Sequence, residues 1–150
     1  MKIERILFPV DFTSASTKVL PYALYLAEKL GAKLYILYVV EDLSRYTSIP
    51  VAHVSLASFE KELEEAAGKK MESFVEENLQ GFSNYETHIT KGDAAGEIVT
   101  FAKLHDIDLI VMATHGRKGL EKALFGSVTE KVLKISPVPV LTVNPEQVRS

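Results

Sequence analysis

The 150-residue sequence contains no cysteine. This absence excludes disulfides, thiolate chemistry and cysteine-ligated metals, and it suits a reducing cytoplasm. No apolar run approaches the roughly 18 residues of a membrane-spanning helix, and the opening MKIERILFPVDF does not resemble a signal peptide. A basic excess is also missing, since the net charge is −3. We therefore expect a cytoplasmic protein whose partners include neither nucleic acid nor a membrane.

Several motifs that would indicate an enzyme or a metal site are absent as well. The sequence has no GxxxxGK[ST], no GxGxxG after its first strand-like run, and no GxSxG. The SGGxDS-type loop and the HIGH and KMSKS motifs of adenylating enzymes do not occur. The four histidines form no HxxxH or HExxH pair (His53, His88, His105 and His115). We predict no catalytic residue and no metal site made by protein ligands alone.

What is present is a regular alternation of short apolar runs and longer helical patterns. The runs are apolar nearly throughout, as in strands covered on both faces. They are Ile3–Pro9, Lys33–Val40, Tyr85–Thr90, Leu109–Ala113 and Val138–Val143. Four helical patterns separate them, so the order predicts one α/β domain, residues 1–150, with a parallel five-stranded sheet.

The helices have recognisable ends. An apolar stripe from Val19 to Leu30 ends at Gly31, and Pro21 requires either a start near Thr17 or a kink. A second stripe runs over Leu56–Leu79. The third helix begins after Asp93, a capping residue, and the fourth runs from Gly126–Ser127 to about Ser136. Pro137 and Pro139 predict an edge position for the last strand, and Glu41–Ser55 is long enough for a lid or binding loop.

Ligands of open parallel sheets bind at the carboxyl ends of the strands. The first run is followed by Asp11 and the fourth ends in MATHG, Met112–Gly116. If these two strands are neighbours, both segments share one crevice. Asp11 could bind a metal or a hydroxyl group, or it could cap the following helix.

The fourth helix begins at Gly126–Ser127, where unpaired N–H groups and a partial positive charge suit a phosphate. The hydroxyls of Ser127 and Thr129 could donate to phosphate oxygens, and Arg117 and Lys118 could add positive charge. The alternative is that Gly126 is only a helix cap. His115, in the same region, could contact a phosphate or act as a base.

With these residues in view, the sequence resembles the universal stress protein family over almost its whole length. The matching segments, in the family's order, are ILFPVDF, GDAAGEIVTFA, DLIVMATHGRKGLEKALFGSVTEKVL and SPVPVLTV. The nucleotide-binding branch carries G-x2-G-x9-G-[ST], and Gly116, Gly126 and Ser127 match its second half. The first glycine of that motif is Ala113 here. Alanine would weaken binding if the position needs a left-handed backbone and would do little otherwise.

This resemblance implies a Rossmann-like sheet (adenine nucleotide alpha hydrolase-like) in strand order 3-2-1-4-5, with helices on both faces. It implies ATP or AMP as the ligand, and Mg²⁺ or Mn²⁺ could accompany the nucleotide. The implied binding residues are Pro9, Val10, Asp11, Val39, Met112, Ala113, His115, Gly116, Gly126, Ser127, Val128 and Thr129. Family members commonly form homodimers through the last strand, here Val138–Val143.

The resemblance implies a stress-response regulatory protein in which nucleotide occupancy modulates dimer or partner interactions. Two alternatives remain at this point. The protein could be a slow ATPase or autokinase, or an interaction module whose nucleotide site is vestigial. Whether it is an enzyme is left open.

Overall fold

The computed structural model describes residues 1–42, 53–116 and 125–148. The elements, in chain order, are β1 (Arg5–Val10), α1 (Ser14–Leu30), β2 (Lys33–Glu41), α2 (His53–Asn78), β3 (Tyr85–Gly92), α3 (Ala94–Leu104), β4 (Leu109–Ala113), α4 (Ser127–Ile135), β5 (Val140–Val143) and a short 3-10 helix, η2 (Pro145–Gln147). The predicted alternation of strands and helices is therefore confirmed. Of the expected loop Glu41–Ser55, residues 43–52 lie outside the described ranges, as do Arg117 and Lys118. No described helix is both long and apolar enough to cross a membrane.

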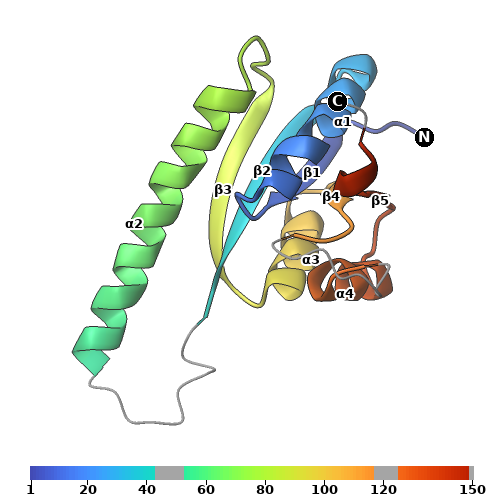
Figure 1. Cartoon of the computed structure of the whole chain (residues 1–150). Helices are drawn as coiled ribbons and strands as arrows, with labels where there is room; N and C mark the ends of the chain where they lie inside the picture. The colour runs from blue at the N-terminus through green and yellow to red at the C-terminus, as the bar shows by residue number, and fades with distance from the viewer. Residues whose placement is uncertain (43–52, 117–124, 149–150) are drawn as a thin grey trace.

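The five strands form one parallel sheet in the order β3-β2-β1-β4-β5, which confirms the expected order (Figure 1). β1 pairs with β2 on one side and with β4 on the other. The strand order therefore reverses between β1 and β4. Crevices at such a point, outside the carboxyl ends of the strands, are where ligands of doubly wound sheets bind.

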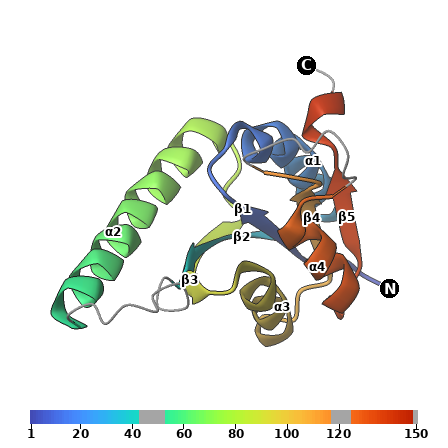
Figure 2. The same cartoon turned by 60° about the horizontal axis from the view of Figure 1, so that its bottom comes forward.

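The helices cover both faces of the sheet, α1 and α2 on one and α3 and α4 on the other (Figure 2). One core cluster joins α1 and α2 to the sheet and includes Val19, Phe74 and Phe8. The second joins α3 and α4 to the opposite face and includes Ile98 and Val132. Burial of these apolar side chains is the main favourable contribution to folding.

The prediction of continuous apolar burial holds for the central strands. β1, β2 and β4 are buried along most of their length, whereas side chains of β3 alternate between exposed and half-buried. β5 contains no buried residue, and its Leu141 is 39% exposed. The difference follows from position, because β3 and β5 are the two edges of the sheet.

The start of α1 differs from one of the two alternatives given by the sequence, a start near Thr17. The helix begins at Ser14, three residues before Thr17, so Pro21 lies inside it. Gly31 ends it in the left-handed conformation (φ 64°), as expected for a glycine after a helix. Asp93 caps α3 by accepting a hydrogen bond from the Gly96 N–H at 3.0 Å.

The last strand is at an edge, as its prolines predict, but it is shorter than expected. It begins at Val140 rather than Val138. The hydroxyl of Ser136 donates to the Val138 carbonyl and accepts from the Val138 N–H, and this turn holds Val138 outside the ladder. Just before β5 begins, the carbonyl of Pro139 accepts a hydrogen bond from the Ile110 N–H of β4.

Candidate functional site

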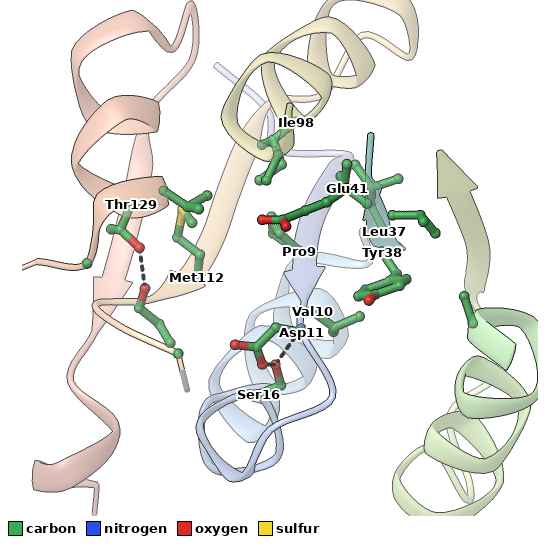
Figure 3. Close-up of a pocket in the computed structure, with 18 of the residues that line it drawn as sticks. Pro9, Val10, Asp11, Ser16, Leu37, Tyr38, Glu41, Ile98, Met112 and Thr129 are labelled. Atoms are coloured by element: carbon green, nitrogen blue, oxygen red, sulfur yellow. Dashed lines mark hydrogen bonds between the residues drawn. The ribbon is translucent and has the colours of Figure 1, made fainter. Parts of the chain in front are cut away.

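A cavity of about 640 Å³ lies at the carboxyl ends of β1, β2 and β4, bounded by α2, α3 and the start of α4 (Figure 3). This volume falls in the ordinary range for small-molecule sites. All twelve predicted binding residues line it: Pro9, Val10, Asp11, Val39, Met112, Ala113, His115, Gly116, Gly126, Ser127, Val128 and Thr129. The fold thus brings together residues from four separate segments of the chain.

Asp11 follows β1 directly, and its two carboxylate oxygens have different surroundings. Oδ1 accepts hydrogen bonds from the Thr13 N–H (3.0 Å), the Thr13 hydroxyl (2.6 Å) and the Ser16 hydroxyl (2.9 Å). The Ser16 hydroxyl also accepts from the Asp11 N–H at 3.1 Å. Asp11 therefore binds residues at the start of α1, but it is not the cap that one of the two hypotheses expected, since the N-cap is Thr13 and it makes no side-chain cap hydrogen bond. These contacts leave Oδ2 without a recorded partner among the described residues.

Gly116 lies against Asp11. A Cβ atom built on Gly116 would overlap Asp11 Oδ2. The backbone of Gly116 is not in the left-handed region, so its conformation does not require glycine. What requires glycine is the close approach of the loop after β4 to the carboxylate after β1.

Thr114 ties the start of α4 to the sheet. Its N–H donates to the carbonyl of Val143 (3.0 Å), and its carbonyl accepts from the Gly126 N–H (2.7 Å). Gly126 is the N-cap of α4, and no side chain among the described residues caps this helix as Asp93 caps α3. The first-turn residues of α4, Ser127–Thr129, line the cavity. This helix terminus therefore supplies positive partial charge to the cavity wall.

The side chain of Thr129 is already committed within the protein. It is 4% exposed, and its hydroxyl donates to the carbonyl of Ala113 at 2.8 Å (Figure 3). The expected donation from the Thr129 hydroxyl to a phosphate is therefore replaced by a bond within the protein. The hydroxyl-bearing residue of this turn that is exposed is Ser127.

His115 borders the cavity and contacts the C-terminal segment. Its Nδ1 lies 3.1 Å from the Thr114 hydroxyl. Its Nε2 is buried without a hydrogen-bond partner among the described residues and lies 3.9 Å from a carboxylate oxygen of Glu146. The His115 ring therefore lies between the cavity and the 3-10 helix η2, which carries Glu146.

Comparison with known proteins agrees with this arrangement. The pattern of the universal stress protein family matches residues 2–144. Universal stress protein MJ0531 of Methanocaldococcus jannaschii is 35% identical over 142 residues, which cover 93% of this chain and 81% of that protein. The chain belongs to the universal stress protein family. A second relative from the same organism, MJ0577, is 30% identical and is covered to 94% of its length.

Solved structures of universal stress proteins share the fold. The structure of MJ0577 superposes with a TM-score of 0.83 at 28% identity and covers 96% of this chain and 97% of that one. A universal stress protein from Archaeoglobus fulgidus, solved in complex with dAMP, has a TM-score of 0.69 at 20% identity and covers 96% of this chain and 100% of that one. A further universal stress protein structure, solved in complex with cAMP, has a TM-score of 0.62 at 20% identity, and the match covers 97% of this chain and 99% of that one.

Ala113, which stands at the first glycine of the family's motif, has the backbone of an ordinary strand residue. Ala113 is the last residue of β4, where it pairs with Val143, and its φ is not positive. Of the two possibilities that the sequence left open, the left-handed one is therefore wrong. An alanine causes no backbone strain at this position.

Eleven further residues line the cavity and were not predicted from the sequence as binding residues. They are Ser16, Leu37, Tyr38, Val40, Glu41, Leu63, Ala66, Ala67, Lys70, Ala94 and Ile98. Alternation along β2 could have indicated Leu37 and Glu41, because side chains two apart on a strand lie on the same face as Val39. No sequence signal places Leu63–Lys70 of α2 beside the ends of β1 and β2.

Proposed function

We propose that this universal stress protein binds an adenine nucleotide, ATP or AMP, in the cavity at the β1–β4 switch point. The observation that carries the proposal is the convergence of two phosphate-compatible groups there. They are the N-terminus of α4, which no described side chain caps, and the loop that Gly116 brings against Asp11. Complexes of two structural neighbours with dAMP and cAMP support the same ligand class.

The order of the strands suggests how the nucleotide lies. Its phosphates would accept hydrogen bonds from the first-turn N–H groups of α4 and from the Ser127 hydroxyl. Its ribose would lie over β1, where Asp11 Oδ2 can accept from a hydroxyl group. Its base would lie against Val39 at the end of β2. The phosphates, the ribose and the base would then each contact groups that suit them: N–H donors, a carboxylate acceptor and an apolar side chain.

A divalent cation would arrive with the nucleotide. The described residues contain no cluster of three or more histidine or carboxylate side chains able to hold a metal alone. Mg²⁺ is often held by one carboxylate together with phosphate oxygens and water, and Asp11 could be that carboxylate. In that case the cation would neutralise phosphate charge next to an acidic group.

We further propose a regulatory role, in which nucleotide occupancy changes contacts with a second copy or another protein. β5 is an edge strand whose outer N–H and C=O groups can pair with a second copy. The loop after β4 is hydrogen-bonded to the end of β5 through Thr114 and Val143. A ligand that contacts Thr114–Gly116 would therefore act close to the β5 edge.

The decisive experiment identifies the ligand directly. Freshly purified protein is heat-denatured, and released nucleotide is identified by chromatography. Calorimetric titration of the nucleotide-free protein with ATP and AMP follows, with and without Mg²⁺, while sedimentation measures its oligomeric state. We expect saturable binding of at least one of the two nucleotides.

The same samples separate the alternatives. Release of ADP and phosphate at a steady rate would favour the slow ATPase. A dimer that neither contains nor binds ATP or AMP would contradict the proposal and favour an interaction module with a vestigial site.

A further inference from the structure

The cavity has two chemically different ends. At the β4 end the wall consists of backbone and small polar groups around Gly126 and Ser127. At the β2 end it is apolar. Leu37 and Val39 lie on one face of the strand, and Pro9 and Ile98 close the space from β1 and α3. The β2 end therefore suits a flat, largely apolar group such as a nucleobase.

Glu41 adds a carboxylate to this apolar wall. Glu41 is two residues beyond Val39, so its side chain lies on the same face of β2. Figure 3 shows its carboxylate directed across the end of β1 toward Pro9. Within the described part of the chain, Glu41 has no recorded hydrogen bond or ion pair.

Two lysines of β3 and α2 are candidate partners for this carboxylate. Lys91 is paired with Glu60. Lys70 lines the same cavity from α2, and within the described residues it forms no ion pair with Glu41. Glu41 is exposed, so water can donate to its carboxylate in the free protein, and a donor group of a ligand in the cavity could take the place of that water.

The spacing of the strands places this carboxylate away from the phosphates. β2 and β4 are separated by β1, and adjacent strands lie about 4.8 Å apart, so the two ends are about 10 Å apart. Repulsion between Glu41 and the phosphates is therefore weak compared with a direct contact. The same spacing puts Glu41 at the base end of a nucleotide and Asp11 between the two ends.

We propose that Glu41 accepts a hydrogen bond from the exocyclic amino group of adenine and thereby selects adenine over hypoxanthine nucleotides. This inference rests on the proposed function. Adenine carries an amino donor at C6, whereas hypoxanthine and guanine carry a carbonyl acceptor there. A carbonyl oxygen facing a carboxylate leaves two acceptors without a proton between them. Sites that hydrogen-bond one group strongly reject the analogue that lacks it.

The test compares ATP with inosine triphosphate (ITP) by calorimetry, in the intact protein and in Glu41→Gln. The intact protein should prefer ATP at least about tenfold, the loss expected for one charge-assisted hydrogen bond. Glu41→Gln should lower the preference toward one, because its amide can donate to the ITP carbonyl as well as accept. Glu65→Gln, an exposed change on α2 outside the cavity wall, should keep the tenfold preference. Thermal unfolding checks that each variant is folded.

Other results would overturn the inference and keep the proposed function. These are equal affinity for ATP and ITP in the intact protein, or an ATP preference unchanged by Glu41→Gln. Binding of 2′-deoxy-ATP separates a ribose contact from a base contact. If the intact protein loses affinity for the deoxy nucleotide and Glu41→Gln does not, then Glu41 binds the ribose. Tighter binding of GTP than of ATP, abolished by Glu41→Gln, would also overturn it. Failure to bind any adenine nucleotide would overturn both proposals.

Discussion

The carboxylate of Asp11 fills the space that a side chain at Gly116 would need. Three hydrogen bonds to Oδ1 fix this carboxylate, so it cannot easily rotate away. A Cβ on residue 116 would overlap Oδ2, although the backbone of Gly116 would accept any residue. The loop after β4 and the turn after β1 are therefore fitted to each other before any ligand binds.

We expect Gly116→Ala to destabilise the fold by about 1–3 kcal/mol, the usual cost of overpacking a fixed contact. Asp11→Ala removes the obstructing group, so Gly116→Ala should cost less than about 0.5 kcal/mol in that background. Denaturant unfolding of the four proteins of this cycle measures the coupling. Equal costs in both backgrounds would show that Asp11 is not what requires glycine at position 116.

Ala113 provides a second test, because it stands where the family's motif has glycine. Its backbone is that of an ordinary strand residue paired with Val143. Ala113→Gly should therefore destabilise the protein by about 0.5–1 kcal/mol through backbone entropy. ATP affinity should change by less than about twofold, a free energy under 0.5 kcal/mol. A tenfold gain in affinity would show that the methyl group obstructs the ligand.

The fold was predictable from the sequence because its signals are local and repeated. Apolar runs such as Leu109–Ala113 mark buried strands, and Gly31 and Asp93 mark helix ends through their own backbone chemistry. The bounds of the edge strand β5 were predicted less well, since the Ser136 turn shortens this strand. Strand order came from family resemblance, because local patterns do not say which strands pair.

The cavity was predictable where it follows strand ends and helix starts. Asp11 and Gly126 could be placed there from position alone, and the structure brings them to one cavity. The α2 wall could not be predicted, because the placement of a helix relative to strand ends depends on packing between distant segments. The hydroxyl of Thr129 illustrates the same limit, since its acceptor, the Ala113 carbonyl, lies 16 residues away.

Gly126 allows the capping and phosphate-binding hypotheses to be separated. A Cβ there would be 3.4 Å from the Cα of His115, an ordinary contact, and its φ of −70° suits any residue. Serine is a better N-cap than glycine, so Gly126→Ser should keep or raise stability by a few tenths of a kcal/mol. Its hydroxyl would accept from the first-turn N–H groups that a phosphate needs, so ATP affinity should fall about tenfold or more.

Gly68→Ala is the control for Gly126→Ser. Gly68 lies inside α2 with open space around its Cα, so alanine should stabilise the protein by about 0.5–1 kcal/mol. It should leave calorimetric ATP affinity unchanged. If Gly126→Ser also leaves affinity unchanged, Gly126 serves only as a cap.

The ion pair between β2 and β3 gives a pH prediction that is independent of the ligand. Hydrogen bonds from Lys33 first and His88 second hold the pKa of Glu86 below its ordinary value of 4.5. A carboxyl whose pKa is lower in the folded state adds stability above its ordinary pKa and loses it as pH falls through the lowered value. Glu86→Gln should therefore be less stable than the intact protein at pH 7, and the two should converge below pH 4.5. Urea unfolding across this range, with Glu72→Gln on the exposed face of α2 as control, measures the difference. A gap that stays constant down to acidic pH would mean that Glu86 contributes by packing and not by its charge.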